Sequence, residues 1–230
     1  MTSLTSAQAE FVDSVVRLQP RVATFDCDGT LWSGDAGEGF FSWELEHWLV
    51  SREVQRWARS RYADYRAGKV PEEIMCGEMV TMHRGLRENV VQQAADDWFP
   101  QGIAANIFPD MQELVRRLRG GGCDVWAVSS SNVWIIRAGM RCFDIPPDRI
   151  LAADAAVENG IILDRLIRVP SGPGKSEAIR EAIHHEPDCA FGNSIWDREM
   201  LEMSKYPFAI NPNPNLKEIA ITNGWRVYQP

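Results

Sequence analysis

Two carboxylates lie one residue apart where a short apolar run ends near the start of the chain. Asp26 and Asp28 follow the β-type residues 22–25, and the turn-forming pair Gly29 and Thr30 comes directly after them. Residues i and i+2 of an extended chain share a face, so both carboxylates can meet at one point. Such a pair is electrostatically costly unless a cation joins it, and Mg²⁺ prefers oxygen ligands of this kind. The stretch therefore predicts a magnesium site at the end of a strand.

A run of serines follows a second apolar segment. Ser129 and Ser130 come directly after residues 125–128, which form a predicted buried strand. A hydroxyl and neighbouring backbone N–H groups at a strand-to-helix turn can hold phosphate oxygens. Serine at such a place also commonly caps the helix that follows. Taken alone, the run is compatible with both uses.

A lysine lies in a glycine-rich stretch further along the chain. Lys175 belongs to the run Gly-Pro-Gly-Lys-Ser at residues 172–176. The spacing is not that of the nucleotide-binding phosphate loop, because Val169 stands where that loop has its first glycine. A single lysine that reaches a phosphate and a merely solvated lysine therefore both stay open.

Polar groups also follow a third apolar segment. Asn193 comes shortly after the predicted strand at residues 189–191, and Asp197 lies about one helical turn further on. The amide of Asn193 can offer a neutral oxygen to a metal ion. The chain thus collects oxygen ligands and polar groups at the ends of three predicted strands.

The elements that must position these groups alternate along the second half of the chain. Predicted helices cover residues 110–119, 174–184 and 196–203, and predicted strands cover residues 124–128, 189–191 and 208–210. An Asn-Gly pair at 159–160 predicts a β-hairpin, and a short amphipathic helix at 7–18 opens the chain. Strands that alternate with helices predict a doubly wound parallel sheet with its site at the carboxyl ends of the strands.

Residues 35–100 have a different sequence pattern from the second half of the chain. Aromatic and charged residues recur there at helical spacing, and breaks at 68–71 and at 85 divide the segment into four predicted helices. We therefore predict an α/β core formed by residues 1–33 and 105–230, with a helical cap domain at 34–104 inserted between two of its strands.

The composition excludes several classes of partner. The chain has 230 residues, 45% of them apolar, and a formal net charge of −8, which argues against nonspecific binding to nucleic acid or to an anionic membrane. Five scattered cysteines without a C-x-x-C pair indicate reduced thiols. No signal peptide and no membrane-spanning run is expected. The expectation is a soluble, cytoplasmic monomer or homodimer.

The polar stretches occur in an order that resembles the four motifs of the haloacid dehalogenase superfamily. Asp26 and Asp28 match the first motif, Ser129 the second, Lys175 the third, and the stretch 193–197 the fourth. With a helical insert after the first motif, the chain is most similar to the phosphoserine phosphatase-like branch. The resemblance covers most of the chain. It implies a Rossmann-like core, Mg²⁺ as cofactor and hydrolysis of a small phosphorylated metabolite.

The resemblance also implies a role for each matched residue. Asp26 attacks phosphorus and forms an aspartyl-phosphate. Asp28 protonates the leaving oxygen and then activates the water that hydrolyses the intermediate. Ser129, Ser130 and Lys175 hold the phosphoryl oxygens.

The implied magnesium ligands include one departure from the family. They are the Asp26 carboxylate, the Asp28 main-chain carbonyl and a side chain of the fourth motif, Asn193 or Asp197. The family normally has an aspartate at position 193, and loss of that charge weakens magnesium binding.

Two alternative functions follow from this departure and from the fold. One is a catalytically weakened binder of a phosphate ligand, motivated by Asn193, and the other is a phosphotransferase that uses an alcohol in place of water. Dehalogenation ranks last, because Asp28 is present.

The sequence indicates less about the substrate than about the reaction. Phosphoserine phosphatases carry a cap arginine shortly before a Lys-Gly-Leu, and here the matching place before Arg84-Gly85-Leu86 is near Met79. No arginine stands there, so a substrate carboxylate would lack its bidentate partner and phosphoserine is disfavoured.

Acidic residues favour an amine as one hypothesis for the substrate. Asp35 lies where the branch uses an acid to hold a substrate ammonium, and Glu38 follows one turn later. Trp32, Trp43 and Trp48 are near enough in sequence to add cation–π contacts. We favour the simpler interpretation that these tryptophans pack the cap against the core.

Overall fold

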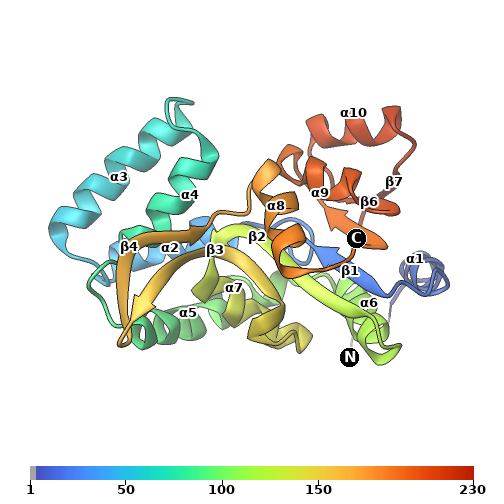
Figure 1. The fold of residues 1–230 in the computed structure, drawn as a ribbon, viewed down its shortest axis with the longest axis horizontal. Coiled ribbons are helices and arrows are strands. Elements are labelled where there is room, and N and C mark those ends of the chain that lie inside the picture. Colours follow the sequence, from blue (N-terminus) through green and yellow to red (C-terminus); the bar gives the residue numbers. More distant parts are fainter. Residues whose placement is uncertain (1–3) are drawn as a thin grey trace.

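The computed structural model describes residues 4–230 and contains one seven-stranded sheet of order β4-β3-β2-β1-β5-β6-β7 (Figure 1). The strands are β1 Val22–Phe25, β2 Asp124–Asn132, β3 Ile150–Glu158, β4 Ile161–Arg168, β5 Cys189–Gly192, β6 Tyr206–Ile210 and β7 Arg226–Tyr228. All neighbouring strands are parallel except the β3–β4 hairpin. The hairpin turns at Asn159 and Gly160, whose φ values of 52° and 76° suit the predicted Asn-Gly turn.

Helices cover both faces of the sheet. They are α1 Ser6–Val16, α2 Ala36–Glu46, α3 Arg52–Arg66, α4 Glu72–Thr81, α5 Glu88–Gly102, α6 Pro109–Gly120, α7 Val133–Met140, α8 Pro173–Ala182, α9 Arg198–Glu202 and α10 Pro214–Thr222. Short 3₁₀ turns lie at η1 Ala104–Asn106, η2 Arg141–Phe143, η3 Pro147–Arg149 and η4 Ile195–Asp197.

The strands bury alternate residues against the two helical layers. Phe25 and Ala127 belong to the larger hydrophobic cluster, which includes α1, α6 and α7. Trp126 and Val128 belong to a second cluster, with α8, α9 and α10 on the opposite face. Because successive residues of a strand point to opposite faces, this partition shows a sheet covered on both sides. The predicted doubly wound fold is confirmed (Figure 1).

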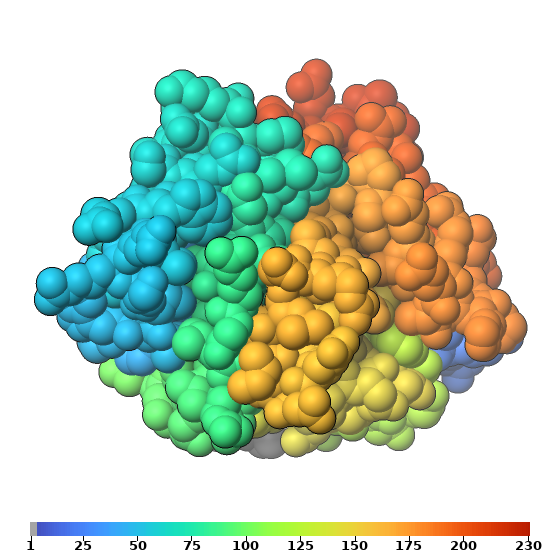
Figure 2. Space-filling model, turned by 60° about the vertical axis from the view of Figure 1, so that its left-hand side comes forward, coloured from blue at the N-terminus to red at the C-terminus, as the bar shows by residue number. Residues whose placement is uncertain are grey.

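The helical segment between β1 and β2 divides its packing between two clusters. Helices α2, α3 and α4 share a small cluster that includes Phe41, Ala58 and Met75. Helix α5 packs instead against α7 and contributes Ala95 and Phe99 to the main core. Helices α3 and α4 project from the core in Figure 1, and α4 lies against β4 on the face shown in Figure 2. The domain boundaries at residues 34 and 104 stay a prediction.

A buried ion pair fixes the helices of this segment to one another. Glu44 on α2 and His83 in the turn after α4 are fully buried, with 2.7 Å between Oε2 and Nε2. Burial opposes the charged imidazole, but the charge of Glu44 and hydrogen bonds with Glu44, Val80 and Met79 outweigh it and raise the pKa of His83. The pair therefore links α2, which begins at the candidate site, to the end of α4.

Three elements differ from the sequence prediction. Strand β2 continues through the serine run to Asn132, and the Asn132 side chain, rather than a serine, accepts the N–H of Ile135 and caps α7. The predicted helix at 196–203 is a 3₁₀ turn followed by the short α9. The edge strand β7 was not predicted, because three residues with only the last partly buried carry little periodicity.

Two further findings bear on the composition. The five cysteines are free thiols. Among residues 4–230, no helix combines the length and the apolar character needed to cross a bilayer.

Candidate active site

A cavity of about 430 Å³ opens at the carboxyl ends of β1, β2 and β5, beneath helices α3 and α4. Its residues fall into two walls. The core wall comes from the strand ends and the α8 turn, and includes Asp26, Asp28, Ser130, Ser131, Lys175 and Asn193. The cap wall comes from α2, α3 and α4, and includes Asp35, Glu38, Tyr62, Tyr65, Arg66 and Glu72.

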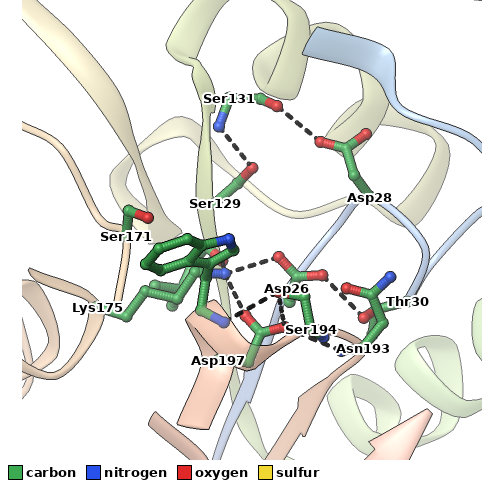
Figure 3. Close-up of polar contacts among 12 residues, drawn as sticks. Asp26, Asp28, Thr30, Ser129, Ser131, Ser171, Lys175, Asn193, Ser194 and Asp197 are labelled. Carbon is green, nitrogen blue, oxygen red and sulfur yellow. Dashed lines mark hydrogen bonds and ion pairs between the residues drawn. The ribbon is translucent and has the colours of Figure 1, made fainter. Parts of the chain in front are cut away.

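Asp26 is buried at the end of β1, and both of its carboxylate oxygens accept hydrogen bonds (Figure 3). Lys175 donates to Oδ1 at 2.7 Å, and the Thr30 hydroxyl donates to Oδ2 at 2.9 Å. Burial and the charge of Asp197 raise the pKa of Asp26 to about 6, against the opposing effect of Lys175 and Thr30. The carboxylate is thus fixed in orientation and faces the cavity.

Lys175 lies in the first turn of α8 and is buried between two acids. Its Nζ donates to Asp26 Oδ1 at 2.7 Å, to Asp197 Oδ1 at 2.5 Å and to the Val128 carbonyl at 3.0 Å. Burial alone would lower the pKa of Lys175, but the charges of Asp197 and Asp26 outweigh it and raise the pKa. The alternative of a solvated lysine is therefore wrong.

Asp197 is fully buried, and its carboxylate organises the loop after β5. Oδ1 accepts the bond from Lys175, while Oδ2 accepts the backbone N–H groups of Asn193 and Ser194, each at 2.9 Å, and the Ser194 hydroxyl at 3.2 Å. Both oxygens are thus engaged by donors of the chain. Of the two fourth-motif residues predicted as metal ligands, Asn193 is the one that lines the cavity.

Asn193 packs directly over the backbone of the first motif. A Cβ placed on Gly29 would lie 1.8 Å from Asn193 Nδ2, and Gly29 has a φ of +77°, so the turn requires glycine on both counts. The amide of Asn193 is in this way held beside the residues that follow Asp28.

Asp28 accepts three hydrogen bonds on its two carboxylate oxygens. Oδ1 accepts the Trp32 indole N–H at 2.8 Å and the Ala36 N–H at 2.6 Å, while Oδ2 accepts the Ser131 hydroxyl at 2.7 Å. Burial and the charge of Asp35 raise the pKa of Asp28 to about 7, and the bonds from Ala36 and Ser131 oppose this rise. Sequence reasoning missed these donors to Asp28, and it also missed Thr30, which donates to Asp26. Trp32 and Thr30 each lie four residues after the carboxylate they contact.

The serine run is distributed differently from the prediction. Ser129 is buried, its Oγ accepts the Ser131 N–H at 3.1 Å, and it is not among the residues that line the cavity. Ser130 and Ser131 do line the cavity. The difference arises because β2 continues through the run with an irregular register, which turns consecutive serines toward different surroundings.

The cap wall is acidic and aromatic. Asp35 caps α2 by accepting the Glu38 N–H at 2.7 Å, and Glu72 in the first turn of α4 accepts the Ser171 hydroxyl at 3.2 Å. Burial raises the pKa of Glu72 to about 7. Within the described part of the chain, no Lys, Arg or His nitrogen lies within 4.0 Å of the Asp35, Glu38 or Glu72 carboxylates.

Two of the three tryptophans named from the sequence are packing residues. Trp32 is fully buried against Phe99, and Trp43 stacks on Phe40. Trp48 is 60% exposed, and none of the three lines the cavity. The preferred packing interpretation is thus confirmed for Trp32 and Trp43.

Different aromatic rings face the cavity. Tyr62 and Tyr65 contribute to its cap wall, and Trp196 contributes at its core side. Met79 also lines the cavity, and the arginine of the cap wall is Arg66 on α3.

The residues that could hold a metal ion are oxygen donors. Among residues 4–230, no group of three or more His, Cys, Asp or Glu side chains is arranged to hold one. The predicted set instead combines the Asp26 carboxylate with two neutral oxygens, the Asp28 carbonyl and the Asn193 amide. Such a set fits Mg²⁺, which typically takes one or two carboxylates and completes its shell with water and substrate phosphate.

The doubly wound sheet thus gathers two carboxylates and a buried lysine at one cavity, which is the arrangement that the four sequence motifs predict. The profile of haloacid dehalogenase-like hydrolases matches residues 23–202, and the chain belongs to that family.

Relatives and solved structures extend over most of the chain. The "inhibition of morphological differentiation protein" of Streptomyces azureus is 26% identical over 218 residues, covering 90% of this chain and 78% of that protein. A phosphoserine phosphatase of Mycobacterium tuberculosis is 24% identical over 215 residues, covering 89% of this chain and 69% of its own.

The structural matches show the fold alone, because their sequence identities are low. A Bordetella pertussis protein of unknown function superposes with a TM-score of 0.76 at 21% identity, over 90% of this chain and 97% of its own. A phosphoserine phosphatase carrying a phospho-aspartyl intermediate analogue superposes with a TM-score of 0.58 at 18% identity, over 91% and 92% of the two chains.

Proposed function

We propose that the protein is a magnesium-dependent phosphatase that hydrolyses a small phosphomonoester through an aspartyl-phosphate on Asp26. The observation that carries this proposal is the fixed Asp26 carboxylate at the end of β1, held by Lys175 and Thr30, with Asp28 on the same side of the cavity. A nucleophile and a second acid at one strand end are what a two-step phosphoryl transfer requires.

The reaction has two steps at these residues. An Asp26 oxygen attacks phosphorus and the bond from phosphorus to the leaving oxygen breaks, while Asp28 gives its proton to that oxygen. Water then attacks the aspartyl-phosphate, Asp28 takes the water proton, and inorganic phosphate leaves with Asp26 regenerated. Bound Mg²⁺ would supply positive charge that offsets the repulsion between the phosphate dianion and the two carboxylates.

Lys175 provides the protein's own positive charge beside the phosphoryl group. It lies 2.7 Å from Asp26 Oδ1 and lines the cavity, so it can compensate charge on the nucleophile and on the transferred group. Asp197 keeps the lysine in place at 2.5 Å. We assign Ser130 to the phosphoryl oxygens in preference to Ser129, because Ser130 faces the cavity.

The cap wall supports a leaving group that carries an ammonium. Among residues 4–230, no cationic nitrogen lies within 4.0 Å of the Asp35, Glu38 and Glu72 carboxylates, which lie beside the rings of Tyr62 and Tyr65. Carboxylates attract such a cation and aromatic rings add cation–π attraction. A carboxylate on the substrate would have Arg66 as its cationic partner on that wall.

A second candidate function rests on Asn193. With an amide in place of a carboxylate among the ligands, the site would bind Mg²⁺ more weakly and the protein would act as a binder of phosphorylated ligands with little turnover. A phosphotransferase of the same fold is distinguished by adding alcohols, which would then become phosphorylated and change the release of phosphate.

The deciding experiment measures phosphate release from p-nitrophenyl phosphate with and without Mg²⁺, in the wild type, Asp26→Asn and Asn193→Asp. We expect magnesium-dependent turnover that Asp26→Asn abolishes, and a lower magnesium requirement in Asn193→Asp. Activity in Asn193→Asp alone would favour the weakened binder. Full activity in Asp26→Asn would overturn the aspartyl-phosphate mechanism.

A further inference from the structure

We propose that Ser131 and Trp32 are positioning residues that hold the Asp28 carboxylate from opposite sides and direct one of its oxygens to the leaving group. This inference rests on the proposed phosphatase function. Trp32 donates to Asp28 Oδ1 at 2.8 Å and Ser131 donates to Oδ2 at 2.7 Å, as Figure 3 shows for Ser131. The two donors come from different elements, the loop after β1 and strand β2.

Both donors are themselves fixed by packing. The Trp32 side chain is fully buried, with its ring against Phe99 at a centroid distance of 5.4 Å. Ser131 is confined by α2, because a Cβ placed on Gly37 would lie 2.4 Å from Ser131 Oγ. The hydroxyl therefore occupies the space between Asp28 and the first turn of α2, and neither donor can follow a rotation of the carboxylate.

The chemistry of the donors distinguishes the two Asp28 oxygens. Oδ1 accepts from an indole N–H and from the Ala36 backbone N–H, which are donors only. Oδ2 accepts from a serine hydroxyl, which can donate or accept. Oδ1 cannot carry the proton without losing one of its two donors, whereas Oδ2 can carry it and still accept from Ser131. Oδ2 is therefore the oxygen that delivers the proton to the leaving group.

Fixation is needed because like charges surround Asp28. The neighbouring carboxylates of Asp26 and Asp35 both act on it. Without the Ser131 bond the carboxylate can turn away from them, and a general acid beyond hydrogen-bond reach of the leaving oxygen is ineffective. A leaving group that departs readily without protonation is insensitive to this loss, whereas a poor leaving group is not.

The test compares p-nitrophenyl phosphate, which has a good leaving group, with phenyl phosphate, which has a poorer one. In Ser131→Ala and in Trp32→Phe, we expect kcat/KM to fall roughly 10-fold or more for phenyl phosphate and less than about 3-fold for p-nitrophenyl phosphate. Asp28→Ala should show the same pattern with a larger ratio. Ser204→Ala, which changes a serine that does not line the cavity, should leave both values unchanged.

A double mutant shows whether Ser131 acts through Asp28. Adding Ser131→Ala to Asp28→Ala should cause no further loss on phenyl phosphate. Equal losses on both substrates in Ser131→Ala, or a further loss in the Asp28→Ala background, would overturn the proposal. Either result is distinct from failure of the proposed function, which would appear as full activity in Asp26→Asn.

A second measurement needs no turnover. The indole N–H resonance of Trp32, identified by its disappearance in Trp32→Phe, reports the bond to Asp28 Oδ1. Ser131→Ala should shift this resonance, because release of Oδ2 allows the carboxylate to rotate, and Ser204→Ala should not. An unchanged resonance in Ser131→Ala would contradict the proposal that Ser131 and Trp32 together position the Asp28 carboxylate.

Discussion

The two walls of the cavity differ in how their charged groups are held. On the core wall, Asp26, Asp28 and Lys175 each make two or more hydrogen bonds to fixed partners, as does the buried Asp197 that holds Lys175. On the cap wall, the only donors that residues 4–230 direct to the carboxylates of Asp35, Glu38 and Glu72 are neutral. The charged groups of the core wall are thus compensated by partners within residues 4–230, and the carboxylates of the cap wall are not.

This difference separates chemistry from recognition. Groups that act on a phosphoryl centre gain from fixed orientation, because no reorganisation is then needed when charge develops in the transition state. Groups that await a substrate keep unsatisfied charge, which costs stability until a ligand of opposite charge arrives. Under the proposed function, the reaction belongs to the core wall and the choice of substrate to the cap wall.

The largest predicted effect comes from replacing Lys175, the cation of the core wall. Replacing Lys175 with methionine leaves Asp26 and Asp197 buried without their shared cation, and loss of one partner from a buried ionic cluster costs about 3–5 kcal/mol. Urea unfolding should show this loss, together with loss of phosphatase turnover. Lys205→Met, at an exposed lysine, is the control, and equal stability of the two variants would contradict the prediction.

The cap wall should respond in affinity rather than in stability. In Glu38→Gln and in Glu72→Gln, we expect KM for phosphocholine to rise up to about 10-fold with kcat little changed, because each removes one attractive charge outside the reacting centre. The uncharged isostere 3,3-dimethylbutyl phosphate should show no such rise.

Glu73→Gln is the matched control for the cap wall, because Glu73 is the neighbour of Glu72 on α4 but is exposed and does not line the cavity. If the two cap variants raise KM equally for phosphocholine and for its neutral isostere, an ammonium-binding wall is excluded and the acids have another role.

The same division explains what could be predicted from the sequence. Asp26, Asp28 and Asn193 each follow a strand end, Lys175 begins the helix after the β3–β4 hairpin, and topology brings such positions together. Their local order is therefore enough to predict the core wall. The burial of Lys175 was left open, because one lysine in a glycine-rich run carries no signal of its surroundings.

The cap wall could be predicted only at its start. Asp35 and Glu38 follow the first motif closely, but Tyr62, Tyr65 and Glu72 reach the cavity through the packing of α3 and α4, which periodicity does not specify. The contact of Ser131 with Asp28 could not be predicted for a related reason. The serine run was expected at a turn, and only the continued strand with its irregular register turns Ser131 toward Asp28.

The smallest predicted effect is the pH dependence of stability contributed by Glu72. Its pKa is raised from 4.5 to about 7 in the folded protein, chiefly by burial. Between these values the folded state binds more protons than the unfolded state, so the contribution of Glu72 to the free energy of unfolding falls as pH rises from about 4.5 through about 7. Glu72→Gln removes this dependence, so the variant should gain stability relative to the wild type across that interval.

The gain should be on the order of 1 kcal/mol, because partial exposure of Glu72 to solvent screens much of the shift. Urea unfolding at pH 5 and at pH 8 measures it, with Glu73→Gln as the control that shows no pH-dependent difference. A Glu72→Gln variant whose stability relative to the wild type is the same at both pH values would mean that this carboxylate is compensated in the folded protein. The charges of the cap wall would then be as well compensated as those of the core wall, and the distinction between the two walls would lose its electrostatic basis.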